Sequence, residues 1–123
     1  MRVLIVEDET IIAMHLRMLV EELGHQVCAT ANSVAQAIER TAALRPDVVL
    51  MDIYLARGTS GVDAVRELHE RLGLRCIVLS ANVDEPTKTA LLPYEPIAFV
   101  GKPVLPVLLQ RALKKAEEGL TQL

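Results

Sequence analysis

Polar side chains follow four short apolar runs in this sequence. Residues 3–6 are followed by Glu7 and Asp8, residues 48–51 by Asp52, residues 76–79 by Ser80, and residues 97–100 by Gly101 and Lys102. A run this apolar is typical of a strand that is buried on both faces of a sheet. The carboxyl ends of parallel strands meet at one edge of the sheet, where open α/β folds keep their sites. We therefore expect three carboxylates, a hydroxyl and an ammonium group to lie together.

Such a cluster suits phosphoryl transfer. Three carboxylates at one place repel one another, and this raises the pKa of at least one of them. A divalent cation removes the conflict, and hard oxygen ligands favour Mg²⁺. A carboxylate beside the metal can act as a nucleophile, with aspartyl phosphate as the covalent product. Lys102 and the metal would neutralise charge on the phosphoryl oxygens, and Ser80 can donate a hydrogen bond to one of them.

Each residue alone has a simpler structural explanation. A single acid at the end of a strand is usually solvated or caps a helix, Ser80 alone would be a turn residue, and Lys102 alone a solvated charge. The expected convergence of all these residues at one edge outweighs those explanations. By contrast, His15, His25 and His69 have no partner spacing for a metal or for catalysis. We assign them no role.

Alternating strand and helix patterns surround these residues. Strands are predicted at 2–6, 27–31, 48–51, 76–79 and 97–100, and helices before Gly24, from Ser33 to before Pro46, and over 62–72, 84–92 and 106–118. The alternation indicates a parallel sheet with helices on both faces and right-handed crossovers. Five strands favour the flavodoxin-like order 2-1-3-4-5. We predict an α/β fold of five strands and five flanking helices, forming one domain over residues 1–123.

The expected helix after Ser33 illustrates how the apolar faces are assigned. Ser33 and Gln36 have the form of a capping box, which opens a helix. Ile38 and Ala42 would then share its buried face with Val34 and Ala37.

The composition excludes several classes of function. With 2% aromatic residues and a net charge of −3, the chain lacks the features of an aromatic or basic nucleic-acid surface. Cys28 and Cys76 lie in apolar runs and are expected to be buried, reduced thiols, which fits a cytoplasmic protein. No signal peptide precedes Met1, and no apolar run approaches the ~20 residues that span a bilayer. We expect no membrane insertion and no direct nucleic-acid binding.

The full set of motifs resembles the receiver domain of bacterial two-component response regulators. The resemblance rests on Glu7, Asp8, Asp52, Ser80, Lys102 and Pro103, in that order and spacing, and covers essentially the whole chain. It implies a switch that accepts a phosphoryl group from a histidine kinase or a histidine phosphotransfer protein. The loop motif with Gly58 and Ser60-Gly61 also resembles a subset of stand-alone receivers.

The resemblance implies a role for each acidic residue. Asp52 would be the phosphoacceptor. Asp8 and Asp52 would bind Mg²⁺ directly, together with the backbone carbonyl of Tyr54. Glu7 would act largely through a metal-bound water.

It also implies the residues that bind and sense the phosphoryl group. Lys102 would bind the phosphate, with a cis peptide bond to Pro103. Ser80 would move inward to bond the phosphoryl group. Phe99 occupies the aromatic switch position.

The sequence departs from the family pattern in two places. Leu55-Ala56 replaces the usual Met-Pro, and the loop reaches its glycine one residue later. Residues 91–96 contain two prolines, so we predict a short or irregular fourth helix. Tyr54 and Asn82 would flank the phosphoryl group, and we expect the bulk of Tyr54 to slow attack by water.

Three other functions compete with phosphorylation-controlled switching. A docking module would use the same fold without phosphorylation. A flavodoxin-like electron carrier is disfavoured because residues 7–9 are acidic and would repel the FMN phosphate. A metal-dependent phosphatase would need a second acid two residues after Asp52, where Tyr54 stands. We therefore expect catalysis only of the chain's own phosphoryl uptake and loss.

The partners of the switch follow from the family's output face. That face is formed by the fourth helix, fifth strand and fifth helix, which here is the 84–118 region, and it would bind an unknown downstream protein. No output domain follows the last helix, so we expect a single-domain regulator, a phosphorelay shuttle or sink, or an excised receiver. The amphipathic last helix could form a homodimer, but packing on its own sheet is the favoured interpretation.

Overall fold

The computed structural model describes residues 1–53, 61–81 and 84–121, with eleven regular elements. The strands are β1 (Arg2–Val6), β2 (Gln26–Ala31), β3 (Val48–Asp52), β4 (Cys76–Ser80) and β5 (Ala98–Gly101). The helices are α1 (Thr10–Glu22), α2 (Val34–Leu44), α3 (Gly61–Leu72), α4 (Glu85–Leu91), the 3₁₀ turn η1 (Leu92–Tyr94) and α5 (Pro106–Thr121). The predicted alternation of strands and helices is confirmed.

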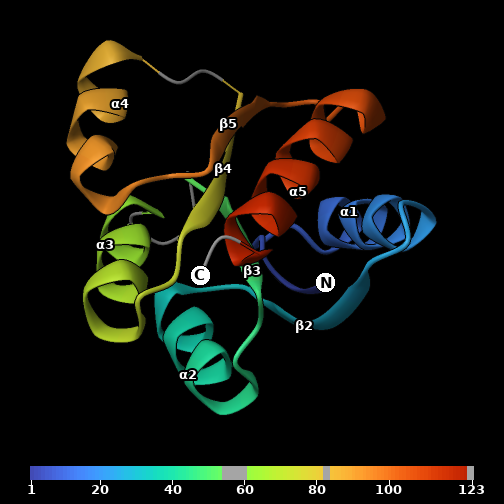
Figure 1. The fold of residues 1–123 in the computed structure, drawn as a ribbon, viewed down its shortest axis with the longest axis horizontal. Coiled ribbons are helices and arrows are strands. Elements are labelled where there is room, and N and C mark those ends of the chain that lie inside the picture. Colours follow the sequence, from blue (N-terminus) through green and yellow to red (C-terminus); the bar gives the residue numbers. More distant parts are fainter. Residues whose placement is uncertain (54–60, 82–83, 122–123) are drawn as a thin grey trace.

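The five strands form one parallel sheet in the order β2-β1-β3-β4-β5. This confirms the predicted fold class and strand order. Helices α1 and α5 cover one face, while α2, α3 and α4 cover the other (Figure 1). All carboxyl ends of the strands therefore point to the same edge of the sheet.

The centre of the sheet is fully apolar, except where its strands end. In β3 and β4 every residue is buried, and in β1 only Arg2 is partly exposed. Alternate side chains enter two separate cores, one under α1 and α5 and the other under α2 and α3. Continuous apolar runs are what a strand covered on both faces requires.

The start of α2 shows a sequence prediction that is partly right. The Ser33 hydroxyl accepts a hydrogen bond from the Gln36 N–H at 3.2 Å, and the Gln36 side chain accepts one from the Asn32 N–H at 3.0 Å. The cap was predicted, but Ala42 is exposed and Thr41 is buried instead. Thr41 lies four residues after Ala37 and so shares its face, whereas Ala42 lies one step further around the helix.

Helix α4 is short, as predicted. Asp84 caps its first turn by accepting a hydrogen bond from the Thr87 N–H at 2.8 Å. The α-helix ends at Leu91, and the 3₁₀ turn η1 contains Pro93, whose ring cannot continue a helix interior. Glu95 then takes a left-handed conformation with φ of 50°.

The two cysteines are free thiols in different surroundings. Cys76 is buried, as predicted, and burial raises the pKa of its thiol to about 12. Cys28 is only half-buried, and its thiol donates to the Val3 carbonyl at 3.4 Å. Cys28 lies on strand β2 at the edge of the sheet, which leaves one side of the strand uncovered. Across the described residues, no helix is both long and apolar enough to cross a membrane.

Candidate functional site

The predicted functional residues lie together at the carboxyl edge of the sheet. We call Glu7, Asp8, Asp52, Ser80 and Lys102 the acidic rim. Glu7 directly follows β1, Asp52 ends β3 and Ser80 ends β4. These three residues are at most 3% exposed, although polar groups are costly to bury.

The three carboxylates form a compact oxygen cluster. Glu7, Asp8 and Asp52 each offer one oxygen atom, and these atoms all lie within 4.8 Å of one another. The cluster arises because β1 and β3 are neighbours in the sheet, with Val6 in register with Met51. Residues far apart in the sequence are thus brought together by the strand order alone.

Lys102 supplies the positive charge of the acidic rim. Its Nζ lies 2.8 Å from Glu7 Oε2 and 3.0 Å from Asp52 Oδ2. Its backbone N–H donates to the Ser80 carbonyl at 2.9 Å, which ties the end of β5 to the end of β4. The Lys102–Pro103 peptide bond is cis, as the family resemblance implied.

Burial and pairing shift the ionisation of the acidic rim. Burial raises the pKa of Glu7 even though the bonds from Lys102 and from the Glu9 N–H oppose that rise. Burial also lowers the pKa of Lys102, but its bonds and charge interactions with Glu7 and Asp52 outweigh that effect, so the net pKa is raised. The site therefore holds a firmly protonated ammonium group between two buried carboxyl groups.

Three carboxylate groups that each offer an oxygen atom are suitable ligands for Mg²⁺. Within the described part of the chain, the acidic rim holds three carboxylates and one ammonium group, and a divalent cation would neutralise the remaining negative charge. Glu7, Asp8 and Asp52 are therefore the residues that fit a metal ion.

Gly61 contributes to the site in a way that sequence analysis missed. Its N–H donates to the Ile53 carbonyl at 3.1 Å, so α3 starts in contact with the end of β3. A Cβ atom at Gly61 would lie 2.5 Å from Ile53 Cα and 2.6 Å from the Asp52 carbonyl oxygen. The sequence indicated a turn residue. The close approach of its backbone to the end of β3 is visible only in the folded structure.

The remaining predicted residues lie beyond the acidic rim. Phe99 is half-buried, and Lys88 Nζ from α4 lies 5.8 Å from the centre of its ring. Tyr54 and Asn82 lie outside the described residues, so their predicted roles stay predictions.

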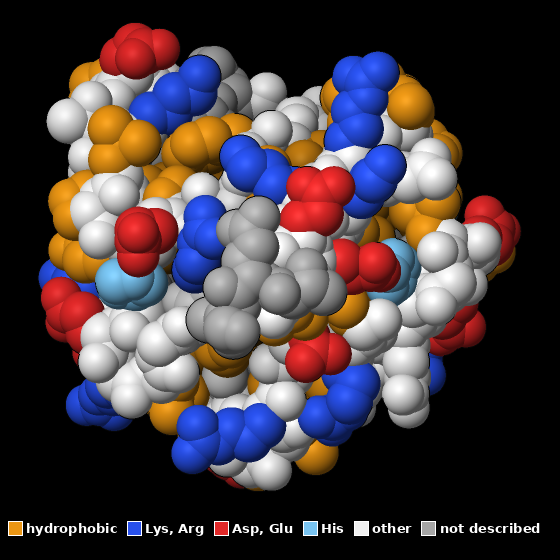
Figure 2. Space-filling model, viewed as in Figure 1, with side chains coloured by type: hydrophobic (Ala, Val, Ile, Leu, Met, Phe, Trp, Pro, Cys, Tyr) orange, Lys and Arg blue, Asp and Glu red, His pale blue; other side chains and the backbone are white. Residues whose placement is uncertain are grey.

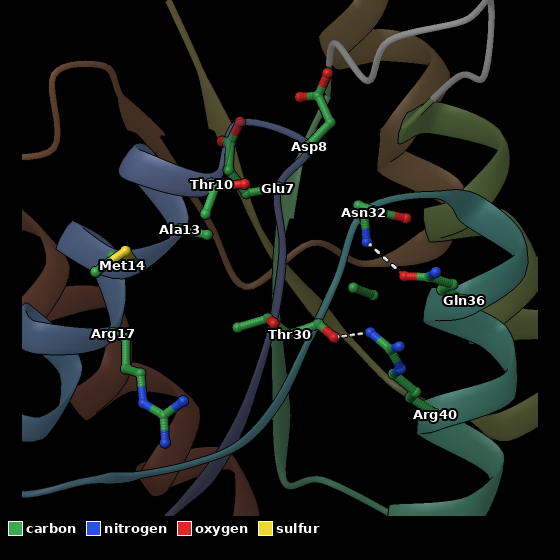
Figure 3. A pocket seen from close by; sticks show the side chains of 11 residues that line it. Glu7, Asp8, Thr10, Ala13, Met14, Arg17, Thr30, Asn32, Gln36 and Arg40 are labelled. Atoms are coloured by element: carbon green, nitrogen blue, oxygen red, sulfur yellow. Dashed lines mark hydrogen bonds between the residues drawn. The ribbon is translucent and has the colours of Figure 1, made fainter.

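A groove beside the acidic rim was also missed. It runs between α1 and α2 over the end of β2 and has a volume of about 280 Å³ (Figure 3). Glu7 and Asp8 line one end, and Arg17 and Arg40 the other. No motif links these residues in the sequence, because the two helices that carry them are brought together by the sheet.

The two histidines that pair with glutamates belong to the opposite edge of the sheet. His25 Nδ1 lies 3.4 Å from Glu117 Oε1, and His69 Nε2 lies 3.2 Å from Glu95 Oε2. Figure 2 shows two histidines on one face, each beside an acidic side chain. Their contacts lie near the starts of β2 and β5, away from the acidic rim.

Comparison with known proteins gives one consistent family. Residues 3–114 match the model of the response regulator receiver domain. The chain is 37% identical over 115 residues to the phyllosphere-induced regulator PhyR of Methylorubrum extorquens, covering 93% of this chain and 42% of that protein. It is 30% identical to the chemotaxis protein CheY of Thermotoga maritima, covering 95% of this chain and 98% of that protein.

Solved structures agree with this result. The crystal structure of the response regulator PhyR from Brucella abortus aligns with a TM-score of 0.81 and 35% identity, covering 98% of this chain and 50% of that one. The chain thus spans about half the length of the PhyR proteins that it matches, and nearly all of CheY.

Proposed function

Because the chain belongs to the receiver domains of response regulators, we propose that it is a switch that accepts a phosphoryl group on Asp52 from a phosphohistidine donor. The observation that carries the proposal is the acidic rim. Glu7 and Asp52 are almost fully buried, and both contact Lys102. Folding does not require two buried carboxylates side by side, since apolar residues of similar size serve as well.

In the proposed reaction Asp52 is the nucleophile. One of its carboxylate oxygens forms a bond to phosphorus while the bond between phosphorus and the donor's imidazole nitrogen breaks. The electron pair of that bond returns to the nitrogen, which takes up a proton. Lys102 already contacts Asp52 at 3.0 Å, so its ammonium group lies where it can pair with a phosphoryl oxygen. Such preplaced charge supplies most of what phosphoryl transfer needs.

Mg²⁺ would be held by Glu7, Asp8 and Asp52. When bound, it would neutralise charge on the carboxylates and on the transferred group. The chain's own contribution is to hold the oxygen atoms of these residues within 4.8 Å of one another before the metal arrives. The raised pKa of Glu7 fits a group that is poorly placed as an anion unless a cation is near.

Ser80 and Phe99 would transmit the reaction to a partner. Ser80 is 1% exposed at the end of β4, and Phe99 is half-buried on the neighbouring strand β5. A hydrogen bond from the Ser80 hydroxyl to the phosphoryl group would draw the end of β4 toward Asp52. The adjacent 84–118 surface, which includes the exposed Leu92, would then change its affinity for a downstream protein.

Intact mass measurement tests this function. The protein would be incubated with acetyl phosphate, with and without Mg²⁺, beside Asp52→Asn and the matched control Asp63→Asn on the exposed side of α3. We expect one added phosphate in the wild type and in the control. No adduct is expected in Asp52→Asn or without Mg²⁺. An adduct that persists in Asp52→Asn would contradict the assignment.

A second candidate function is a docking module that works without phosphorylation. The observation that favours it is the similarity to PhyR, because the related PhyR of Bartonella quintana is described as an anti-anti-sigma factor, which implies action through protein binding. This chain would then bind its partner equally well as wild type and as Asp52→Asn, and acetyl phosphate would add no mass. A phosphate adduct that alters partner binding would exclude this candidate.

A further inference from the structure

A small pocket lies at the amino edge of the sheet, opposite the acidic rim. It is bounded by the residues that directly precede β3, β4 and β5 and by the last turns of α5, and its volume is about 210 Å³. We call it the amino-edge pocket; the lining residues that matter for its chemistry are Asp47, Leu74, Arg75, Ile97, Gly119 and Leu120. The volume lies below the roughly 300–1,000 Å³ of sites for drug-sized ligands and cofactors, so the pocket suits a compact molecule.

Two groups of opposite charge line the amino-edge pocket without pairing with each other. Asp47 is half-buried, and one of its oxygens accepts a hydrogen bond from the Arg2 N–H at 2.8 Å. Arg75 Nε donates to the Glu95 carbonyl at 2.8 Å, which fixes the guanidinium group beside the pocket. Among residues 1–53, 61–81 and 84–121, neither side chain has a group of opposite charge within 4.0 Å. A ligand that carries both an ammonium and a carboxylate group could pair with both.

The rest of the pocket is apolar, and a glycine leaves it open. Ile97 is 5% exposed, Leu74 is half-buried and Leu120 is 39% exposed, so an aliphatic group could cover the two leucines and remove them from water. Gly119 lies inside α5, where glycine is less favourable than alanine. Neither a positive φ nor close packing requires glycine there, because the nearest atom to an added Cβ would be Arg75 Nη1 at 3.7 Å. The missing side chain instead keeps the amino-edge pocket open.

We propose that the amino-edge pocket binds a small zwitterion, namely an α-amino acid with an aliphatic side chain of the size of leucine. Its ammonium group would pair with Asp47 and its carboxylate with Arg75. Its aliphatic chain would lie against Leu74 and Leu120. Partial enclosure strengthens both charge interactions relative to open water, and the need for two charges in one orientation sets the specificity. The inference goes beyond the proposed function, because it uses no residue of the acidic rim.

Titrations of the isotope-labelled full chain with a matched set of probes test the proposal by NMR spectroscopy. L-Leucine carries both charges and the aliphatic chain. Isocaproate lacks only the ammonium group, isoamylamine lacks only the carboxylate, and glycine lacks the aliphatic chain. The backbone amide signals of Leu74, Gly119 and Leu120 report on the pocket.

Each probe is titrated into the wild type and into variants that remove one charge of the pocket at a time. Asp47→Asn keeps an oxygen for the Arg2 N–H and loses the negative charge, whereas Arg75→Gln loses the positive charge. The matched controls outside the pocket are Asp52→Asn at the acidic rim and Arg71→Gln, an exposed arginine on α3.

We expect L-leucine to bind the wild type with a dissociation constant on the order of 1 mM, because so small a ligand makes few contacts. The other probes should bind about fivefold more weakly or worse, since each lacks one of the three sets of contacts. Asp47→Asn should weaken leucine about tenfold without weakening isocaproate. Arg75→Gln should weaken leucine about fivefold without weakening isoamylamine, a smaller effect because Arg75 is exposed. Both controls should bind all probes as the wild type does.

Filling the pocket from within gives a second readout. Gly119→Leu places an aliphatic side chain where the ligand would lie, so it should abolish the shift of the Leu74 amide signal on addition of leucine. Gln110→Leu adds the same side chain on the exposed side of α5 and should leave that shift unchanged.

Three results would overturn the proposal. If L-leucine at about ten times the expected dissociation constant shifts no amide signal of the pocket, amino acids of this class do not bind there. Shifts that persist in Gly119→Leu would place the ligand elsewhere on the chain. Equal weakening of leucine and isocaproate by Asp47→Asn would show that Asp47 supports the local fold around Arg2 rather than an ammonium group. No phosphodonor enters these titrations, so failure of the proposed function leaves the test of the pocket intact.

Discussion

The two edges of the sheet treat charge in opposite ways. At the carboxyl edge, Glu7 and Asp52 lie side by side with 3% exposure each. At the amino edge, polar groups lie nearer the surface and meet hydrogen-bonding partners, as His69 Nε2 and Glu95 Oε2 do at 3.2 Å. The first arrangement places like charges together away from water, and the second follows what ordinary surface electrostatics favours.

This difference separates the parts of the chain that serve stability from those that serve function. Surface pairs such as that of His69 and Glu95 contribute about 0–1 kcal/mol each. Buried carboxylates cost several kcal/mol unless a cation or a set of hydrogen bonds compensates. Lys102 compensates only part of the charge at the acidic rim. The carboxyl edge should therefore be sensitive to small changes and to Mg²⁺, and the amino edge should not.

The largest difference in stability is expected between alanine substitutions at two glycines. A Cβ at Gly61 would collide with backbone atoms of Asp52 and Ile53, whereas one at Gly119 on α5 would have 3.7 Å to its nearest neighbour, a flexible arginine. Gly61→Ala should lower the free energy of unfolding by about 3 kcal/mol, because the backbone must move apart. Gly119→Ala should raise it by roughly 0.5 kcal/mol through a lower entropy of the unfolded chain. Urea denaturation measures both, and equal effects would remove the contrast.

The next effect concerns the cation of the acidic rim. Lys102→Met should cost about 2 kcal/mol of unfolding free energy in the absence of metal, since Glu7 and Asp52 would lose their counter-charge. The expected cost is below the roughly 3–5 kcal/mol for breaking a fully buried pair because the Lys102 side chain is 19% exposed. Thermal unfolding with EDTA measures this cost, and Lys114→Met on the exposed face of α5 serves as the control.

Addition of Mg²⁺ sharpens the same comparison. A ligand that binds only the folded state stabilises it by ~2.7 kcal/mol at a concentration 100 times its dissociation constant. We expect Mg²⁺ to raise the Tm of Lys102→Met and of the wild type, but to leave the Tm of Asp52→Asn nearly unchanged. A similar rise in all three proteins would indicate that the metal does not bind at the acidic rim.

The smallest effect is expected at the amino edge. Burial lowers the pKa of His25 below its ordinary value of 6.5, and the nearby amino group of Met1 lowers it further, while Glu117 opposes both. Well above pH 6.5 neither the folded nor the unfolded protein carries this proton. As the pH falls through 6.5 and then through the folded pKa, the unfolded protein binds the proton first, so stability is lost.

This loss can be assigned to one histidine. The Tm of His25→Gln should fall less than that of the wild type as the pH is lowered from about 7 through this range. If His25→Gln follows the wild-type curve, His25 is not the group responsible.

Local sequence patterns were enough to predict the fold. The strands β1, β3 and β4 could be identified as continuous apolar runs because both faces of the sheet are covered. The end of α4 could be identified because the ring of Pro93 excludes a further helical turn. The exposed Ala42 was misplaced because alanine is tolerated on either face of a helix. Only the packed structure distinguishes it from Thr41.

The acidic rim was predictable for the same reason, and its surroundings were not. Asp52 and Ser80 end buried strands, so parallel pairing alone places them together. The contact of Gly61 with the backbone of β3 and the position of Arg40 beside β2 depend on how loops and helices close over the sheet. No spacing rule in the sequence encodes those distances.

Strand β2 carries a consequence for the behaviour of the protein in concentrated solution. An edge strand with open N–H and C=O groups can recruit a strand from another molecule and so begin aggregation. Here the pairing of β2 with β1 shifts register between Val3 and Leu4, so Cys28 is an extra residue without a partner in β1. In addition, the Arg40 side chain donates a hydrogen bond to the Thr30 carbonyl. An irregular strand with one acceptor already covered is a poor template for sheet extension. The Arg40 side chain would thus help to keep the chains from associating through their sheets.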